Sequence, residues 1–188
     1  MTRTYTLKRR AEQQAETRQR IVEAAVELHT RVGPARTTVS MIAERAGVQR
    51  HTFYAHFPDE RSLFMACSGL VEERDPLPDA GPWESIKDRG ERLRVGLRAI
   101  YSWYERNTEL LTNVLRDAEV HALARETAEL RFGPFLSRYK EILGANFDAR
   151  QRAMLSLALS FHTFRTLVRE NGLKPEDAIG AMIDAISP

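Results

Sequence analysis

One stretch, residues 36–64 (RTTVSMIAERAGVQRHTFYAHFPDERSLF), constrains the fold most, because it holds two short helical patterns separated by a glycine. The first pattern places apolar residues at helical spacing, which predicts a helix with one buried face. These residues are Val39, Ile42, Ala43 and Ala46. Gly47 is predicted to end this helix, since glycine adopts the left-handed backbone conformation without a Cβ penalty.

The second pattern, residues 48–57, places Phe53 and Phe57 four residues apart, so both are predicted to point inward. The outward side chains are then polar, basic or aromatic: Gln49, Arg50, His51, Thr52, Tyr54 and His56. A short helix, a glycine turn and a second helix with such a face is the pattern of a helix-turn-helix. Its second helix would enter the DNA major groove, where amide, guanidinium and imidazole groups can read base edges and hydroxyls can contact phosphates.

Residues 37–64 (TTVSMIAERAGVQRHTFYAHFPDERSLF) resemble the DNA-binding domain of the tetracycline-repressor (TetR) family of bacterial transcription regulators. The resemblance continues upstream and covers about the first third of the chain, through Arg18, Ile21, Ala24, Ala25, Leu28 and Gly33. It implies a phosphate contact near Thr37 or Thr38. It also implies that Gln49, Arg50 and His51 face bases, and that Thr52, Tyr54 and His56 face the DNA backbone.

Two positions depart from the family pattern. Gln49 stands where the family usually has a serine that caps the recognition helix, and glutamine is a poorer N-cap. Glu60 stands where the family usually has a lysine that contacts phosphate, so Arg61 is the alternative contact at this end. We therefore expect fewer phosphate contacts than a typical member makes.

Charge is distributed unevenly along the chain. Residues 1–62 contain eleven lysines and arginines against seven acidic residues, whereas residues 63–188 contain seventeen against nineteen. The positive excess lies in the candidate DNA-binding segment, as an electrostatic footprint for phosphate binding should. A chance fluctuation of charge is the alternative explanation.

The sequence divides into an N-terminal arm, a DNA-binding domain and a second domain that follows a linker. Residues 1–14 form a basic N-terminal arm with Arg3, Lys8, Arg9 and Arg10, interpreted either as a solvated tail or as an arm along DNA. Residues 15–75 form the DNA-binding domain, with a first helix at about 17–31, the helix-turn-helix at about 38–57 and a fourth helix from Asp59 to about Arg74. Residues 75–82 (DPLPDAGP) contain three prolines and a glycine, which indicates a linker.

Residues 76–188 form the second domain, and nothing in the sequence after the linker indicates a strand. We expect helices at about 83–106, 107–117, 121–143 with a kink or break at Gly133–Pro134, 149–171, and from Pro175 onward. Asp148 with Gln151 resembles a capping box. The predicted fold is therefore all-α, with an N-terminal three-helix DNA-binding domain joined through helix four to a C-terminal helical ligand-binding and dimerisation domain.

The last two helices carry more apolar residues than one buried face can use, which predicts a homodimer interface. The predicted interface residues are Phe164, Val168, Ile179, Met182, Ile183 and Ile186. A dimer would place two recognition helices about one turn of duplex apart, on a palindromic operator. The family resemblance implies the same arrangement.

The family resemblance also implies that the C-terminal domain binds a small-molecule effector that releases DNA. The candidate ligand-binding residues are Tyr101, Trp103, Tyr104, Phe132, Phe135, Phe161, His162 and Arg165. The alternative is that these aromatic residues are plain core. The sequence thus predicts a ligand-responsive repressor, with an architectural or protein-recruiting DNA binder that has no ligand as the alternative.

Other functional classes lack support in the sequence. The five histidines fall in no metal-ligand spacing, and no nucleophile-elbow or phosphate-binding motif is present, so neither an enzyme nor a cofactor is predicted. Cys67 is interpreted as a small core residue. Without an apolar signal segment or a run of about 20 apolar residues, the chain is predicted to be soluble and cytoplasmic.

Overall fold

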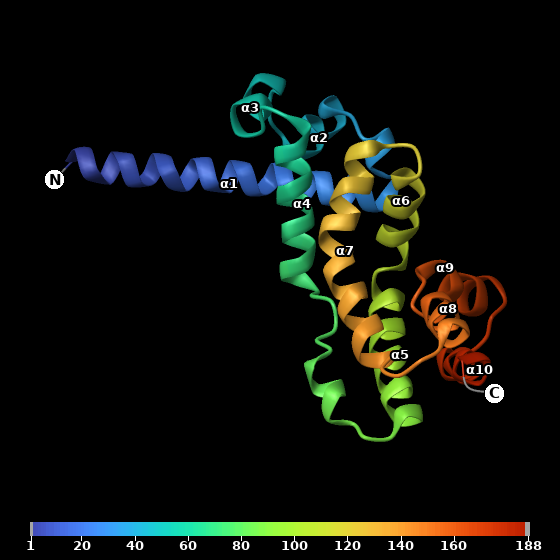
Figure 1. The fold of residues 1–188 in the computed structure, drawn as a ribbon. Coiled ribbons are helices and arrows are strands. Elements are labelled where there is room, and N and C mark those ends of the chain that lie inside the picture. The colour runs from blue at the N-terminus through green and yellow to red at the C-terminus, as the bar shows by residue number, and fades with distance from the viewer. Residues whose placement is uncertain (1, 187–188) are drawn as a thin grey trace. The chain divides into compact units, whose positions relative to one another are not determined.

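The computed structural model describes residues 2–186, with side chains from residue 7 onward, and every element in that range is helical (Figure 1). The chain forms two compact units. The N-terminal unit comprises Met1–Pro76 and Thr112–Ala128, and the C-terminal unit comprises Leu77–Leu111 and Glu129–Pro188. The first boundary lies within the predicted linker, but residues 112–128 belong to the N-terminal unit rather than to the second domain.

The N-terminal unit is built on five helices and on parts of two later ones. They are α1 (Thr2–Arg31), the 3-10 helix η1 (Pro34–Arg36), α2 (Val39–Ala46), α3 (Arg50–His56), α4 (Glu60–Arg74), the end of α6 (Thr108–Ala118) and the start of α7 (Ala122–Leu143). Their apolar faces meet in one core: Ile21, Val22, Ala24, Ala25, Ile42, Ala46, Phe53, Phe57, Leu63 and Cys67. The four helices predicted for this region are present, although the first one has a different start, and Cys67 is a core residue as expected.

Helix α1 begins much earlier than the predicted residue 17. Residues 2–31 contain no glycine or proline, so nothing in the sequence interrupts the helix. The predicted basic arm is therefore helical, and its first half extends beyond the rest of the N-terminal unit in Figure 1. Lys8, Arg9 and Arg10 are exposed on it, whereas the side chain of Arg3 lies outside the described residues.

The turn between α2 and α3 has the geometry that the sequence predicted. Thr38 caps α2, because its side-chain oxygen accepts a hydrogen bond from the Met41 N–H at 3.3 Å. Gly47 adopts the left-handed conformation (φ 66°, ψ 39°), and the N–H groups of Gly47 and Val48 donate to the carbonyls of Glu44 and Ala43. This pair of bonds is a Schellman motif, which fixes the angle at which α3 leaves α2.

The C-terminal unit contains the remaining helices and differs from the prediction in detail. They are the 3-10 helix η2 (Gly81–Ser85), α5 (Arg89–Arg106), α8 (Ala149–Ala158), α9 (Phe161–Phe164), the π-helix η3 (Arg165–Glu170) and α10 (Pro175–Ile186), with the remaining parts of α6 and α7. Helix α5 begins at residue 89 rather than 83, because the Asp88 carboxylate caps it through the Glu91 N–H at 2.7 Å. Helix α7 continues through Gly133–Pro134 as one element.

The single helix predicted for residues 149–171 is wrong. Its capping box at Asp148 and Gln151 is confirmed, but α8 ends at Ala158. The buried Tyr104 hydroxyl donates to the Leu159 carbonyl at 2.6 Å, and the Ser160 side chain accepts from the His162 N–H to start α9. These two side chains stabilise the break, and the chain continues as the π-helix η3.

Part of the predicted dimer interface is covered by the chain itself. Ile179 and Ile186 are fully buried, because α10 packs against α5 and α8, and Phe164 of α9 is fully buried against Tyr101 and Tyr104 of α5. Arg98 of α5 also pairs with Glu176 of α10 at 2.8 and 3.0 Å. Two of the four predicted interface residues on α10, Ile179 and Ile186, are therefore covered by the chain itself and are not available to a partner. The other predicted interface residues, Val168, Met182 and Ile183, are partly exposed.

No helix in the described part of the chain combines the length and the apolar character needed to cross a bilayer.

Candidate nucleic-acid interface

Helix α3 presents a polar face to solvent and an aromatic face to the core. Phe53 and Phe57 are only 3% and 1% exposed, and their rings are 5.9 Å apart. The Arg18 guanidinium of α1 lies 4.9 Å from the Phe57 ring centroid, a cation–π contact that ties α3 to α1. The predicted inward direction of both phenylalanines is confirmed.

The predicted base-facing residues lie together at the start of α3. Gln49, Arg50 and His51 are exposed, and among the described residues their side chains form no hydrogen bond or ion pair. Gln49 occupies the N-cap position without a side-chain cap, as its residue type predicted. An amide, a guanidinium and an imidazole thus lie at the start of a helix that Phe53 and Phe57 anchor in the core, with their polar groups available to a partner.

The predicted backbone-facing residues flank this group. Tyr54 is 47% exposed and lies edge-on to Phe53 at 5.5 Å, while Thr52 and His56 are half-buried. The two candidate threonines before α2 differ, since the Thr37 hydroxyl donates to the Gly33 carbonyl at 2.8 Å whereas Thr38 is the exposed N-cap. Thr38 is therefore the threonine at the start of α2.

The start of α4 is engaged by the start of α7. Asp59 caps α4 by accepting the Ser62 N–H at 2.6 Å, and the Glu60 carboxylate lies 3.3 Å from His121 Nε2. Arg61 pairs with Glu126, although both side chains remain more than half exposed. The arginine proposed to replace the missing lysine thus already has an acidic partner in the DNA-free protein.

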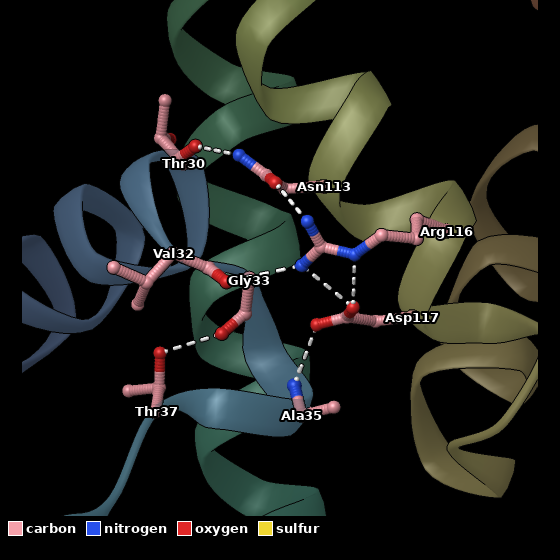
Figure 2. A network of polar contacts seen from close by, with 8 residues as sticks. All are labelled: Thr30, Val32, Gly33, Ala35, Thr37, Asn113, Arg116 and Asp117. Atoms are coloured by element: carbon pink, nitrogen blue, oxygen red, sulfur yellow. Dashed lines mark hydrogen bonds and ion pairs between the residues drawn. The ribbon is translucent and has the colours of Figure 1, made fainter.

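A second group of contacts joins the end of α1 to α6 (Figure 2). The Asn113 side-chain amide donates to the Thr30 carbonyl at 2.6 Å, and Arg116 donates to the Val32 carbonyl at 3.0 Å. The last carbonyls of a helix have no partner within it, so these side chains satisfy the end of α1. Asn113 also accepts from Arg116 at 2.8 Å, which holds the two donors in register.

Asp117 extends the same network into the loop before α2. Its buried carboxylate accepts from the Ala35 N–H and from Arg116 Nε, both at 2.8 Å. Gly33 has φ +94°, and a Cβ at this position would lie 2.3 Å from Asp117 Oδ2. Sequence reasoning missed the α6 residues, because Asp117 lies 82 positions from its partner Ala35 and the polar face of α6 does not reveal which loop it meets.

The predicted ligand-binding aromatics mostly lie together in the C-terminal unit. Tyr101, Trp103, Tyr104 and Phe161 are buried, and Phe132 contacts Trp103 with a 6.0 Å ring separation. Phe135 is half-buried, and its ring lies 6.4 Å from that of Tyr139. The Tyr101 hydroxyl is buried without a hydrogen-bond partner, and burial raises its pKa to about 12.

The two predicted polar ligand contacts differ in their surroundings. His162 is exposed, with its ring 6.1 Å from that of Phe161, and Arg165 pairs with Glu170 at 3.0 Å. Burial also raises the pKa of the Cys67 thiol to about 12, which keeps it protonated and unreactive. Among the described residues, no cluster of three or more histidine, cysteine or acidic side chains could hold a metal ion.

Comparison with known proteins places this surface in a family. The model for bacterial regulatory proteins of the tetR family matches residues 21–67. The HTH-type transcriptional regulator TtgR of Pseudomonas putida is 40% identical over 83 residues, which cover 44% of this chain and 40% of TtgR. Nucleoid occlusion factor SlmA of Vibrio cholerae is 30% identical over 115 residues, which cover 61% of this chain and 57% of SlmA. The chain thus spans about half the length of these relatives.

Solved structures extend the likeness to nearly the whole chain at the level of fold. A TetR family transcription regulator from Marinobacter aquaeolei is similar with a TM-score of 0.60 and 19% identity, covering 93% of this chain and 97% of that chain. PfmR, a TetR family transcriptional regulator from Thermus thermophilus, gives a TM-score of 0.59 and 22% identity, covering 88% and 96%. At these identities the likeness shows the fold alone.

Proposed function

Since the chain belongs to the tetR family of bacterial regulatory proteins, we propose that it is a sequence-specific DNA-binding regulator of transcription, most simply a repressor. The observation that carries this proposal is the exposed set of Gln49, Arg50 and His51 on a helix anchored by Phe53 and Phe57. A rigid helix with free polar groups is what base readout in the major groove requires. A protein that acts on bacterial DNA would work in the cytoplasm.

The proposed roles divide by chemistry. Arg50 can form two hydrogen bonds to a guanine, Gln49 can pair similarly with an adenine, and His51 can reach an adjacent base edge. Thr38, Thr52, Tyr54 and His56 are proposed to contact phosphates, with Thr37 at the same end and Arg61 as a further contact once it leaves Glu126. Glu60 would repel phosphate, and its carboxylate lies 3.3 Å from His121 Nε2 rather than being free.

We propose that the protein acts as a homodimer on a palindromic operator. Support comes from apolar side chains that the C-terminal unit leaves uncovered: Val168, Met182 and Ile183 are partly exposed, and Leu157 and Leu173 are exposed. An isologous dimer would give two recognition helices spaced by about one duplex turn, roughly 35 Å.

We also propose a small-molecule effector in the C-terminal unit. The buried aromatics around Tyr101 offer apolar surface, and the unpartnered Tyr101 hydroxyl offers a hydrogen bond that the protein itself does not use. An effector that binds there would shift DNA affinity by a coupling free energy of about 1–3 kcal/mol.

Selection of bound sequences from a random DNA pool tests the main proposal. We expect a palindrome with half-sites about one duplex turn apart. Arg50→Ala should then cost about 1–3 kcal/mol at one base pair of each half-site, while Arg152→Ala on the exposed face of α8 should leave binding unchanged. A uniform loss across all sequences would instead assign Arg50 to a phosphate, and recovery of no sequence would contradict specific readout.

The likeness to SlmA favours a second candidate function. That relative is named as a nucleoid occlusion factor, so a DNA binder that recruits or excludes other machinery without a small-molecule effector fits the shared 115 residues as well. A broad compound screen with a DNA-release readout separates the two. Compounds that weaken operator binding several-fold support the sensor, and specific DNA binding without any such compound supports the second candidate.

A further inference from the structure

The N-terminal unit contains a cavity behind the recognition helix. Its volume is about 290 Å³, close to the lower end of small-molecule sites, which span roughly 300–1,000 Å³. The walls come from α2, α3 and α4 and are largely apolar and aromatic: Val39, Ile42, Phe53, Phe57, Leu63 and Phe64. The proposed base-reading residues Gln49, Arg50 and His51 do not line the cavity, whereas two proposed phosphate contacts, Thr37 and Tyr54, do.

One buried polar side chain lines this cavity without using its hydrogen-bonding groups. His29, near the end of α1, is 7% exposed, and its ring lies 5.3 Å from that of Phe64. Among the described residues the His29 imidazole has no hydrogen-bond partner, and its nitrogens are not among the side-chain atoms that are fully closed off from solvent. A ligand in the cavity can therefore replace the contact of the imidazole with solvent by a direct hydrogen bond in largely apolar surroundings.

The protonation state of His29 defines what it can offer. Desolvation lowers its pKa to about 4, with the nearby His121 acting in the same direction and Asp117 opposing. At neutral pH the imidazole is therefore uncharged, with one nitrogen as a hydrogen-bond acceptor and the other as a donor. A neutral acceptor nitrogen in an aromatic cavity suits an N–H or O–H group on a planar ring.

The charge around the cavity limits the ligand further. Asp59 and Glu60 line it at the start of α4, and both are exposed carboxylates. Asp59 is used as the helix cap, and Glu60 lies 3.3 Å from His121 Nε2. An anionic ligand would approach two negative charges here, so repulsion disfavours it.

We infer that this cavity binds a small uncharged aromatic molecule that donates a hydrogen bond to His29. The aromatic walls would pack against the rings of the ligand, and its N–H or O–H group would satisfy the imidazole. The site is separate from the effector site proposed around Tyr101, and the inference does not depend on DNA binding.

Indole is a suitable probe, because it is planar, uncharged and carries one N–H donor. Calorimetric titration of the full-length, DNA-free protein should give saturable binding of indole at millimolar concentration or below. 1-Methylindole lacks the donor and should bind about threefold to tenfold more weakly, the effect of one neutral hydrogen bond. Indole-3-carboxylate should bind more weakly still. Equal binding of all three compounds, or no saturable binding of indole, would overturn the inference.

Variants locate the site. His29→Phe keeps a ring but removes the acceptor, so indole should lose the same threefold to tenfold and 1-methylindole should be unaffected. Tyr101→Phe is the matched control in the other candidate site and should leave indole binding unchanged. If His29→Phe fails to fold by circular dichroism, Ile42→Phe, which fills the cavity wall, replaces it and should abolish binding of both compounds. Indole binding that responds to Tyr101→Phe but to neither cavity variant would move the ligand to the C-terminal unit and reject this site.

Discussion

His29 makes the stability of the protein depend on pH. Its folded-state pKa of about 4 lies below the ordinary value of 6.5, so the unfolded chain binds a proton more readily. The stabilisation by neutral His29 is complete above about pH 6.5 and is lost as the pH falls towards 4. The pKa difference corresponds to about 3 kcal/mol.

This predicts a pH effect that one substitution removes. In urea denaturation, wild type should lose up to about 3 kcal/mol more stability between pH 7 and pH 4 than His29→Gln, which cannot take up a proton. Comparing the two proteins cancels the titration of the carboxylates they share. Parallel stability curves for the two proteins would mean that His29 is not desolvated in the folded state.

Gly33 is predicted to tolerate no side chain. Its φ of +94° disfavours other residues, and a Cβ would lie 2.3 Å from the Asp117 carboxylate. Gly33→Ala should therefore lower the free energy of unfolding by about 1–3 kcal/mol, measured by thermal denaturation. Gly90→Ala is the control, since its Cβ would meet only Asp88 at an ordinary 3.4 Å and should change stability by less than about 0.5 kcal/mol. Similar melting temperatures for both variants would show that the Asp117 contact is not kept in solution.

Residue-level predictions from sequence succeeded where the physics is local. The predicted capping box at Asp148 bonds a backbone N–H three residues away, so the sequence shows both partners. The inward direction of Phe53 and Phe57 follows from helical spacing in the same way. The partners of Asp117 are far along the chain, and no local pattern identifies them.

At the scale of elements, α3 is short and lacks a side-chain cap. It has seven residues, and Gln49 leaves its first N–H groups without a side-chain acceptor. Its position depends on Phe53, Phe57 and the contact between Phe57 and Arg18 rather than on its own helical propensity.

Gln49→Ser should therefore stabilise α3 while altering DNA recognition. A serine cap is expected to add about 1 kcal/mol to the free energy of unfolding in urea denaturation. The same change removes the amide proposed to read a base, so preference at that base pair should weaken in a binding assay on single-base operator variants. Thr52→Ser is the control, because it places a serine at a half-buried position within α3, where the side chain cannot cap the helix. An unchanged stability would indicate that the first turn of α3 is already satisfied by water.

The ion pair between α4 and α7 is predicted to compete with DNA. Glu126→Gln should free Arg61, raising operator affinity by up to about fivefold and steepening the salt dependence by about one phosphate contact. Glu129→Gln, an exposed substitution further along α7, carries the same loss of charge without this pair. If both variants bind alike, the gain comes from net charge and Arg61 does not reach a phosphate.

Helix boundaries were predictable only where a glycine or a proline in the sequence marks them. Gly47 directly follows the last residue of α2, and α10 begins at Pro175, as the sequence predicted. Gly172 has a positive φ and lies two residues after the end of η3. The break after Ala158 depends on the hydroxyl of Tyr104, 55 positions away from Leu159. The helical spacing of apolar residues continues past residue 158 in the sequence, although a tertiary contact ends the helix there.

At the scale of the whole molecule, composition located the first boundary between the two units. It did not show that a later segment of the chain belongs to the N-terminal unit as well. The prolines of residues 75–82 mark the first break, whereas residues 112–128 rejoin the N-terminal unit through contacts with α1 and α4. A linear division of the sequence cannot represent such a unit. The all-α class and the helix-turn-helix needed only local patterns, which explains why both were predictable.

The proposed homodimer gives a prediction at this scale. Ile183→Glu places a charge on the partly exposed stripe of α10 and should convert the dimer to a monomer in sedimentation velocity at micromolar concentration. Leu130→Glu changes an exposed apolar residue on α7 and should leave the dimer intact. A wild-type monomer at this concentration, or a dimer unaffected by Ile183→Glu, would rule out α10 as the interface.

The capping of α1 by Asn113 and Arg116 bears on how such proteins can be engineered. A chimeric biosensor that joins residues 1–76 to a foreign sensor domain at the proline-rich linker would lack Asn113 and Arg116, which bond the last carbonyls of α1. These carbonyls would then need hydrogen-bond donors from the foreign domain. A portable DNA-binding domain therefore needs a graft of residues 112–118 together with residues 1–76, even though 35 residues of other structure separate the two pieces in the gene product.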